Sequence, residues 1–147
     1  MSNNINKHKL YFVVKSPPLS LNNAKYRSGR KKRSTHLWLE NIHKQLPSHH
    51  LSLLSDGFDP SQEYLTFQIL HHVNLFTKSG KISQKSNDLG NVEKYLIDAI
   101  CSSKVNEHTP NLNTDDAYIL DLWSSKRHTD SDPYIEVTIE RCSLSNL

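Results

Sequence analysis

The pattern of apolar and polar positions predicts four strands. Residues 9–15 include the run Leu10-Tyr11-Phe12-Val13-Val14, which is rich in strand formers. Pro17 and Pro18 end this strand because proline cannot donate to a β-ladder. Residues 63–76 alternate between apolar and polar side chains, which predicts a long strand. Shorter patterns predict strands at 117–124 and 134–142, joined by residues 129–133.

Two segments have the periodicity of amphipathic helices. At 35–46, Leu37, Ile42 and Leu46 can share one face, and Pro47 stops the helix. The pattern at 88–101 is clearer. Its apolar positions fall on one face, and its polar positions are spaced three and four apart on another. The apolar face is Leu89, Val92, Leu96, Ala99 and Ile100, and the polar face is Asn91, Lys94 and Asp98.

The remaining stretches predict loops, including an irregular segment at 49–62 with turn residues and a polar loop at 78–87. The order of elements is strand, helix, strand, helix, strand, strand. This order predicts an α+β fold, in which a small mixed β-sheet carries two helices packed on one face. The length of 147 residues suits a single domain over 1–147, with residues 1–8 expected to be disordered.

Charge is distributed unevenly along the chain. The formal net charge is only +3, but six basic residues and no acid lie in the short stretch 25–33, whereas the acids lie mostly after residue 87. A basic arm beside an acidic site is expected of a protein that holds a polyanion and places a cation on it. The candidate DNA-binding residues are Lys25, Arg27, Arg30, Lys31, Lys32 and Arg33. The alternative for this stretch is a solvated loop.

Other composition signals narrow the class of protein. Cys101 and Cys142 stand far apart without a CxxC partner, which argues against a zinc site and favours a reducing compartment. No apolar run is long enough to cross a membrane, so we expect a soluble, cytoplasmic protein. The pairs His49-His50 and His71-His72 suit no single metal centre. We expect one member of each pair to be buried and hydrogen-bonded and the other to be exposed.

The chemistry-bearing residues lie between 88 and 126. Cleavage of a phosphodiester needs an activated water and charge relief on the phosphate, which Mg²⁺ on one or two carboxylates supplies. Asp88, with Asp115 or Asp116, could provide these ligands from two different elements, and Lys94 could neutralise the phosphate. Neighbouring strand residues point to opposite faces, so Asp115 and Asp116 should not share an ion without a bend.

Each of these residues also has an ordinary structural explanation. Asp88 suits a helix N-cap, and Asp115-Asp116 suits a turn before a strand. Lys94 and Asp98 suit an ion pair along one helix face.

In order along the chain, these residues resemble the RusA family of Holliday junction resolvases. That family has an Asp-Leu-Asp-Asn helix start with a following lysine, then an Asp-Asp pair opening a strand that carries a later lysine. Its N-terminal part has a strand, a Pro-Pro turn, an asparagine and a tyrosine followed by basic residues. The matching positions are Asp88-Leu89-Gly90-Asn91, Lys94, Asp98-Ala99, Asp115-Asp116 and Lys126, preceded by Val13-Val14, Pro17-Pro18, Asn22-Asn23 and Tyr26-Arg27.

The resemblance implies a homodimeric endonuclease of recombination and repair, phage-encoded or bacterial, that nicks four-way DNA junctions with magnesium. It implies that Asp88 and Asp116 are metal ligands and that Lys94 is the catalytic lysine. Asn91, Asp98 and Asp115 would then be supporting residues. Dimerisation follows from the resemblance alone, with an exposed strand near 67–76 as a candidate interface.

Gly90 departs from the family pattern, because the family has a third aspartate at this position. Two hypotheses follow. Cleavage persists with two carboxylates and a surrogate, either Glu93 or Asp98, or the chain binds junctions without cleaving them. A third hypothesis is a partner-binding module with no role on nucleic acids. Lys78, Lys81 and Lys85 would add phosphate contacts to a DNA-binding protein.

Overall fold

The computed structural model describes residues 8–19, 32–83, 89–102 and 109–147, and at 89–92 it describes the backbone alone. The predicted disorder at 1–8 therefore falls, apart from His8, outside the described residues. The elements are β1 (Lys9–Val14), α2 (Arg33–Gln45), α3 (Ser48–Ser55), β2 (Glu63–Val73), α4 (Leu89–Cys101), the 3-10 turn η1 (Asp116–Tyr118), β3 (Ile119–His128), β4 (Tyr134–Ser143) and the 3-10 turn η2 (Leu144–Asn146).

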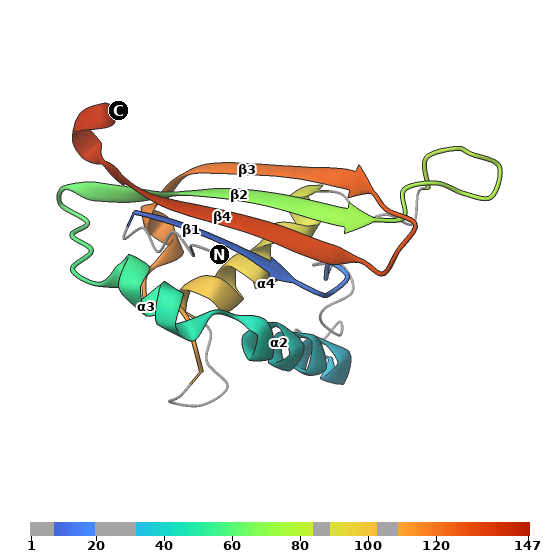
Figure 1. Cartoon of the computed structure of the whole chain (residues 1–147), viewed down its shortest axis with the longest axis horizontal. Coiled ribbons are helices and arrows are strands. Elements are labelled where there is room, and N and C mark those ends of the chain that lie inside the picture. The colour runs from blue at the N-terminus through green and yellow to red at the C-terminus, as the bar shows by residue number, and fades with distance from the viewer. Residues whose placement is uncertain (1–7, 20–31, 84–88, 103–108) are drawn as a thin grey trace, which may run out of the picture.

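The strands form one mixed sheet in the order β1-β4-β2-β3. β4 is antiparallel to both of its neighbours, whereas β2 and β3 are parallel. A parallel pair needs a crossover connection, and α4 provides it between β2 and β3. The helices lie together on one face of the sheet (Figure 1). The predicted α+β class with a small mixed sheet is therefore confirmed.

The core lies between this face of the sheet and the helices. Along β1, and along β4 as far as Ile139, every second side chain is buried. Alternation in the sequence predicts this for β4, whereas β1 is predicted by its strand-forming residues, which are apolar at every position from 10 to 14. The opposite face is open to solvent, where Tyr11 and Val13 are exposed. The largest fully buried side chains include Phe67, Ile69, Ile135 and Ile139 from the sheet and Ile42, Leu51, Leu54, Leu96 and Ile100 from the helices.

The prediction of two helices was wrong, because a further helix, α3 (Ser48–Ser55), covers the first part of the segment predicted to be irregular at 49–62. Its eight residues, SHHLSLLS, are too few to display a clear helical period, and serine and histidine are weak helix formers. Tertiary packing stabilises it instead: Leu51 and Leu54 are buried. Pro47 does not only stop α2, as predicted, but is also the N-cap residue of α3.

Strand boundaries also differ from the prediction. β3 does not begin at 117, because Asp116–Tyr118 form the η1 turn, and it continues to His128 beside the end of β2. β2 ends at Val73, and the chain then forms a short hairpin with a bridge between Phe76 and Ile82.

The segment suggested as an exposed interface strand at 67–76 is not an edge of the sheet over residues 67–73. β2 lies between β4 and β3, and the Phe67 side chain is buried in the core. The edges of the described sheet are β1 and β3. None of the helices in the described part of the chain has the length and apolar character that a membrane crossing requires.

Candidate functional site

The polar face of α4 carries an ion pair between Lys94 and Asp98. The Lys94 Nζ atom lies 3.4 Å from the Asp98 carboxylate, one helical turn away. Both side chains reach solvent. The predicted i,i+4 pairing is therefore present, and a surface pair of this kind contributes only about 0.3–0.5 kcal/mol to stability. Its more important effect is to hold a cation and an anion together on the exposed side of the helix.

The segment that follows α4 is tied to the end of the helix. The Leu112 N–H donates to the Ile100 carbonyl at 2.8 Å, and the Thr114 N–H donates to the Cys101 carbonyl at 3.0 Å. These bonds satisfy two carbonyls that a helix end leaves unpaired. They also fix where the next two residues, Asp115 and Asp116, lie relative to α4.

Asp115 and Asp116 form a turn and do not open a strand as the resemblance implies. The Asp115 carboxylate accepts the Ala117 N–H at 2.8 Å and so caps η1. Asp116 lies in η1 and is exposed, and in the described ranges its carboxylate makes no hydrogen bond. The strand alternation expected to separate the two carboxylates therefore does not apply here.

The carboxylates around this end of α4 all raise the pKa of one buried thiol, that of Cys101. Burial is the main cause that raises the pKa of Cys101 to about 12, and the carboxylates of Asp116, Asp98 and Asp115 raise it further. The structure thus brings these three sequence-predicted residues to one end of α4, with Lys94 one turn back along the helix.

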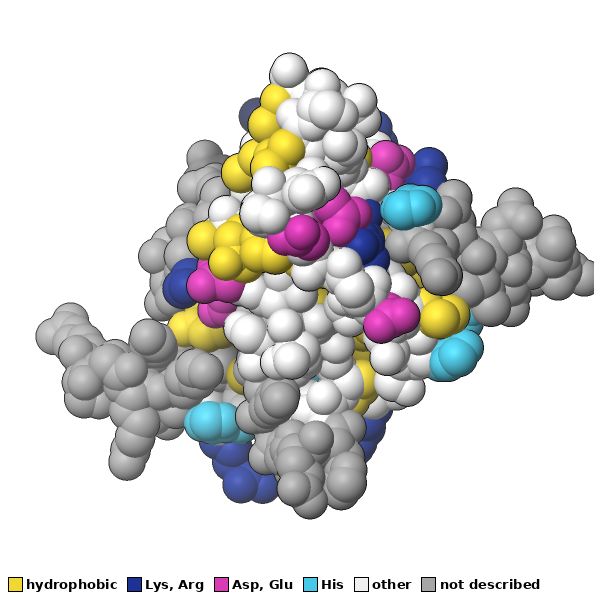
Figure 2. Space-filling model, turned by 90° about the vertical axis from the view of Figure 1, so that its left-hand side faces the viewer, with side chains coloured by type: hydrophobic (Ala, Val, Ile, Leu, Met, Phe, Trp, Pro, Cys, Tyr) yellow, Lys and Arg dark blue, Asp and Glu magenta, His cyan; other side chains and the backbone are white. Residues whose placement is uncertain are grey.

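An open hollow of about 300 Å³ lies next to this acidic end. Its lining residues are Ser55, Phe58, Pro60, Leu112, Asn113, Thr114, Asp115 and Tyr118. Figure 2 looks at the molecule from this side and shows acidic and apolar side chains exposed close together. The acidic end is therefore accessible from solvent.

Gly90 and Asn91, which also belong to the predicted motif, lie at the opposite end of α4. Asp88 lies outside the described residues. The backbones of Gly90 and Asn91 lie in the first turn of α4, and the Asn91 side chain is not described. A helix from Leu89 to Cys101 places its two ends roughly 18 Å apart. Within one chain, the described structure does not bring the start of α4 near Asp116.

Lys126 lies at the same end as the start of α4. It is the parallel-ladder partner of His71, close to where β2 and β3 end. Because α4 runs back along the sheet from this end, the family-matching lysine is separated from Asp116 by most of the length of β3.

Most of the basic arm lies outside the described residues, namely Lys25, Arg27, Arg30 and Lys31. Lys32 is the N-cap residue of α2, and Arg33 is its first residue. α2 has no acidic residue in its first turn and no side-chain cap. The arm therefore leads into the positive end of a helix dipole, which is a favourable place for an anion.

Glu93, proposed as a surrogate metal ligand, points into the protein. Its Oε1 atom lies 2.6 Å from His71 Nε2 and accepts the Ser124 hydroxyl at 2.7 Å. Glu93 and His71 are both buried. The surrogate hypothesis for Glu93 is therefore wrong in this structure, because the carboxylate joins α4 to β2 and β3. The sequence gives one indication of the contact between Glu93, His71 and Ser124: His71 falls at an apolar position in the alternating pattern of residues 63–76.

The expectation for the His71-His72 pair is confirmed for its buried member, His71. His72 is partly buried rather than exposed. It stacks on Tyr134 with ring centroids 4.1 Å apart, and its Nε2 atom lies 3.3 Å from the Glu136 carboxylate. Both histidines thus have structural contacts.

A closed metal cage is not present in the described part of the chain, where no three His, Cys, Asp or Glu side chains are grouped to hold an ion. Mg²⁺ does not require such a cage, because it often keeps its waters and uses one or two carboxylates. The exposed Asp116 carboxylate fits an open site of this kind. No family model matches the chain, and no curated protein is similar to it in sequence.

Proposed function

We propose that the protein is a RusA-like, magnesium-dependent endonuclease that cleaves four-way DNA junctions as a homodimer in the cytoplasm. The observation that supports this most is the gathering of Asp98, Asp115 and Asp116 at one exposed end of α4. Lys94 is held beside them by Asp98. Carboxylates for a cation and an amine for a phosphate are the groups that metal-assisted phosphodiester cleavage uses.

Each residue has a distinct part in this proposal. Asp116, together with Asp88, would hold magnesium, which supplies an activated water and charge relief on the phosphate. Asp115 fixes the backbone of η1 and thereby the position of Asp116. Asp98 orients Lys94, whose ammonium group faces the incoming phosphate. Asn91 would support the same site from α4.

A second copy would explain how Asp88 and Asp116 can serve one ion. β3 is an edge strand, and it exposes Leu120, Leu122 and Trp123. Antiparallel pairing of two β3 strands about a two-fold axis would bring the start of β3 in one copy beside the end of β3 in the other. α4 starts at that end. The pairing would therefore bring Asp116 of one copy towards the start of α4 in its partner.

DNA binding in this proposal comes from the basic arm at 25–33. Its described part, Lys32 and Arg33, leads into the N-terminus of α2. Neutralising phosphates releases counterions, so binding should weaken steeply as salt rises.

The test is a nicking assay on a synthetic four-way junction with magnesium. Wild-type nicking that is lost in Asp116→Asn supports the enzyme, and Asp132→Asn serves as a matched control because Asp132 is an exposed acid in the β3–β4 connection. Loss of one metal-binding carboxylate typically costs several kcal/mol of transition-state stabilisation, so we expect a rate decrease of roughly a hundredfold or more.

Gly90 motivates a second candidate function, a junction-binding protein that does not cleave. Gly90 lies in the first turn of α4 and offers no carboxylate where the family has one. Junction binding without nicking, with activity gained in Gly90→Asp, supports this candidate. If the protein does not prefer junctions over linear duplex at moderate salt, it is neither a junction endonuclease nor a junction-binding protein. The partner-binding role without nucleic acid would then be favoured.

A further inference from the structure

A hairpin over residues 74–83 extends the chain beyond the end of β2 and projects past the sheet (Figure 1). The Thr77 N–H donates to the Lys81 carbonyl at 2.7 Å, and Ser83 N–H donates to the Leu75 carbonyl at 2.7 Å. Gly80 makes the turn with φ of +83°, a conformation that suits glycine. We call this segment the 74–83 hairpin.

The 74–83 hairpin exposes two apolar side chains beside each other. Phe76 and Ile82 form its antiparallel bridge, and residues directly opposite in such a pair point to the same face. The exposed fraction is 43% for Phe76 and 74% for Ile82. Adjacent apolar groups on a projecting element gain free energy when a partner covers them, so this pair is suited to a contact surface.

The Phe76 ring is held in place by the end of β3. It packs against the His128 ring with centroids 4.8 Å apart. His128 Nδ1 accepts the Leu75 N–H at 3.2 Å, so the ring proton is on Nε2, which donates to Asp130 at 2.9 Å. Both ring nitrogens are thus occupied, and His128 is a fixed support for Phe76.

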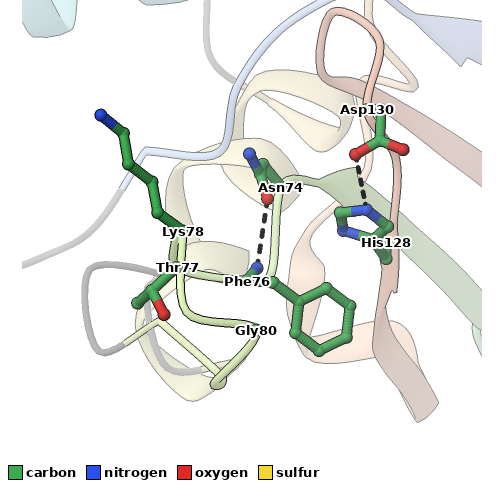
Figure 3. Close-up of a pocket in the computed structure, with 7 residues that line it drawn as sticks. All are labelled: Asn74, Phe76, Thr77, Lys78, Gly80, His128 and Asp130. Carbon is green, nitrogen blue, oxygen red and sulfur yellow. Dashed lines mark hydrogen bonds and ion pairs between the residues drawn. The ribbon is translucent and has the colours of Figure 1, made fainter.

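These side chains border an open hollow of about 450 Å³. Figure 3 shows the Phe76 ring beside His128, with Lys78 extending in the opposite direction. The lining residues are Asn74, Phe76, Thr77, Lys78, Gly80, His128 and Asp130.

The charge of the 74–83 hairpin favours an anionic partner. Residues 74–83 contain two lysines, Lys78 and Lys81, and no acid. Both lysines are exposed. Asp130 is the acid at the rim of the hollow, and it is engaged with His128. An apolar pair flanked by cations complements a nucleic acid, in which bases have apolar faces and phosphates are anionic.

We propose that the 74–83 hairpin is a wedge that contacts unstacked bases at the branch point of a DNA junction. Phe76 and Ile82 lie against the exposed base faces, and Lys78 and Lys81 bind the flanking phosphates. A branch point interrupts base stacking, so a wedge enters there at a lower cost than in a continuous duplex. This inference rests on the DNA-binding function proposed above and names the feature of DNA that the protein selects.

The test uses a four-way junction with 2-aminopurine at the branch point, read by fluorescence and by binding affinity. Wild-type binding should raise the fluorescence as the base unstacks. Phe76→Ala should remove this rise and weaken junction binding roughly 5- to 150-fold, the range for one lost base–aromatic stack. Phe76→Trp keeps a planar ring and should restore both signals.

Further variants separate a wedge from a general effect. Ile82→Ala should also weaken junction binding, and its high exposure leaves the fold unaffected. Leu37→Ala is the matched control, an exposed aliphatic residue on α2, and should leave both signals unchanged. Lys81→Ala should weaken junction and linear duplex binding alike.

The outcomes distinguish this inference from the proposed function. Junction-selective binding with no fluorescence change, and with Phe76→Ala and Ile82→Ala equal to wild type, would overturn the wedge alone. A protein that binds no DNA would overturn both proposals. If the two variants instead convert a dimer to a monomer in light scattering, the hairpin is an interface between copies and the wedge is wrong.

Discussion

His71 Nε2 and Glu93 Oε1 lie 2.6 Å apart in the interior, where they join β2 to α4. This contact fixes the rotation of α4 about its axis. Because Glu93 points towards the sheet, Lys94 and Asp98 are turned outwards, where they form their ion pair. A buried contact that carries no chemistry thereby determines which side of the helix is presented to solvent.

The buried pair gives the first prediction. Removing one member of a buried hydrogen-bonded pair leaves the polar group of the other without its partner, so Glu93→Ala should lower the free energy of unfolding by about 1–3 kcal/mol. Urea denaturation measures this loss. Glu40→Ala, which removes an exposed glutamate from α2, should change stability by less than about 0.5 kcal/mol. The double variant His71→Leu/Glu93→Leu should recover much of the loss, and a purely additive result would contradict the pairing.

Arg141 gives the second prediction, because it links β4 to the end of α3. Its guanidinium binds both Glu63 oxygens at 3.0 and 2.7 Å and donates to the carbonyls of Leu54 and Asp56. Arg141→Ala should lower the free energy of unfolding by about 3 kcal/mol. Arg141→Lys should recover little, because an ammonium cannot make the bidentate contact. Chemical denaturation would contradict this geometry if the lysine variant matched wild type.

The same pair predicts an acid dependence of stability. The hydrogen bonds from Arg141 lower the pKa of Glu63 below its ordinary value of 4.5. The stability that this ionised carboxylate contributes is complete above pH 4.5 and is lost as the pH falls through the lowered pKa. Glu63→Gln should be less stable than wild type at neutral pH and should lose less stability on acidification. Parallel acid titrations of the two proteins, followed by circular dichroism, measure this difference. Identical acid transitions would contradict the prediction.

Cys101 predicts an alkaline dependence. Its pKa is raised from 9.0 to about 12, so its stabilising contribution is complete below pH 9 and is lost as the pH rises towards 12. Cys101→Ala should show a flatter decline in stability over this range. Asp116→Asn removes one of the charges that raise the pKa and should shift the thiolate absorbance of the folded protein to lower pH. An unchanged titration would place Asp116 away from the thiol.

A two-copy site makes a prediction that a single-chain site does not. Asp88→Asn and Asp116→Asn should each be inactive alone. When the two are mixed, roughly a quarter of wild-type nicking should return, because half of the dimers are mixed and each has one intact site of two. If both ligands belong to one chain, no activity returns. Trp123→Lys should give monomers in light scattering, with Leu37→Lys as the exposed control.

Much of the fold follows from local patterns. The strands β2 and β4 follow from alternation, β1 follows from its run of strand-forming residues, and α4 follows from its helical period. The period also predicts α2, but its predicted apolar face was partly wrong, because Ile42 and Leu46 are buried whereas Leu37 is exposed. The Lys94–Asp98 pair follows from spacing alone. α3 does not, since its eight residues are stabilised by tertiary packing of Leu51 and Leu54.

The candidate site is harder to predict because it depends on the order of strands. The sequence places Asp88, Lys94 and Asp116 in one ordered motif. It does not reveal that α4 is a crossover running back along a parallel pair, which separates its first residue from Asp116. Nor does it reveal that Glu93 faces His71, because that contact exists only once β2 lies beneath α4.

The strand order also determines when the protein can fold during synthesis. β4 is the last of the four strands to leave the ribosome, yet it lies between β1 and β2. Until Tyr134–Ser143 has emerged, β1 has no partner strand. The core that buries Leu10 and Phe12 is then incomplete. Loss of β4 through a premature stop codon would therefore leave β1 detached and the sheet split, rather than an almost complete domain.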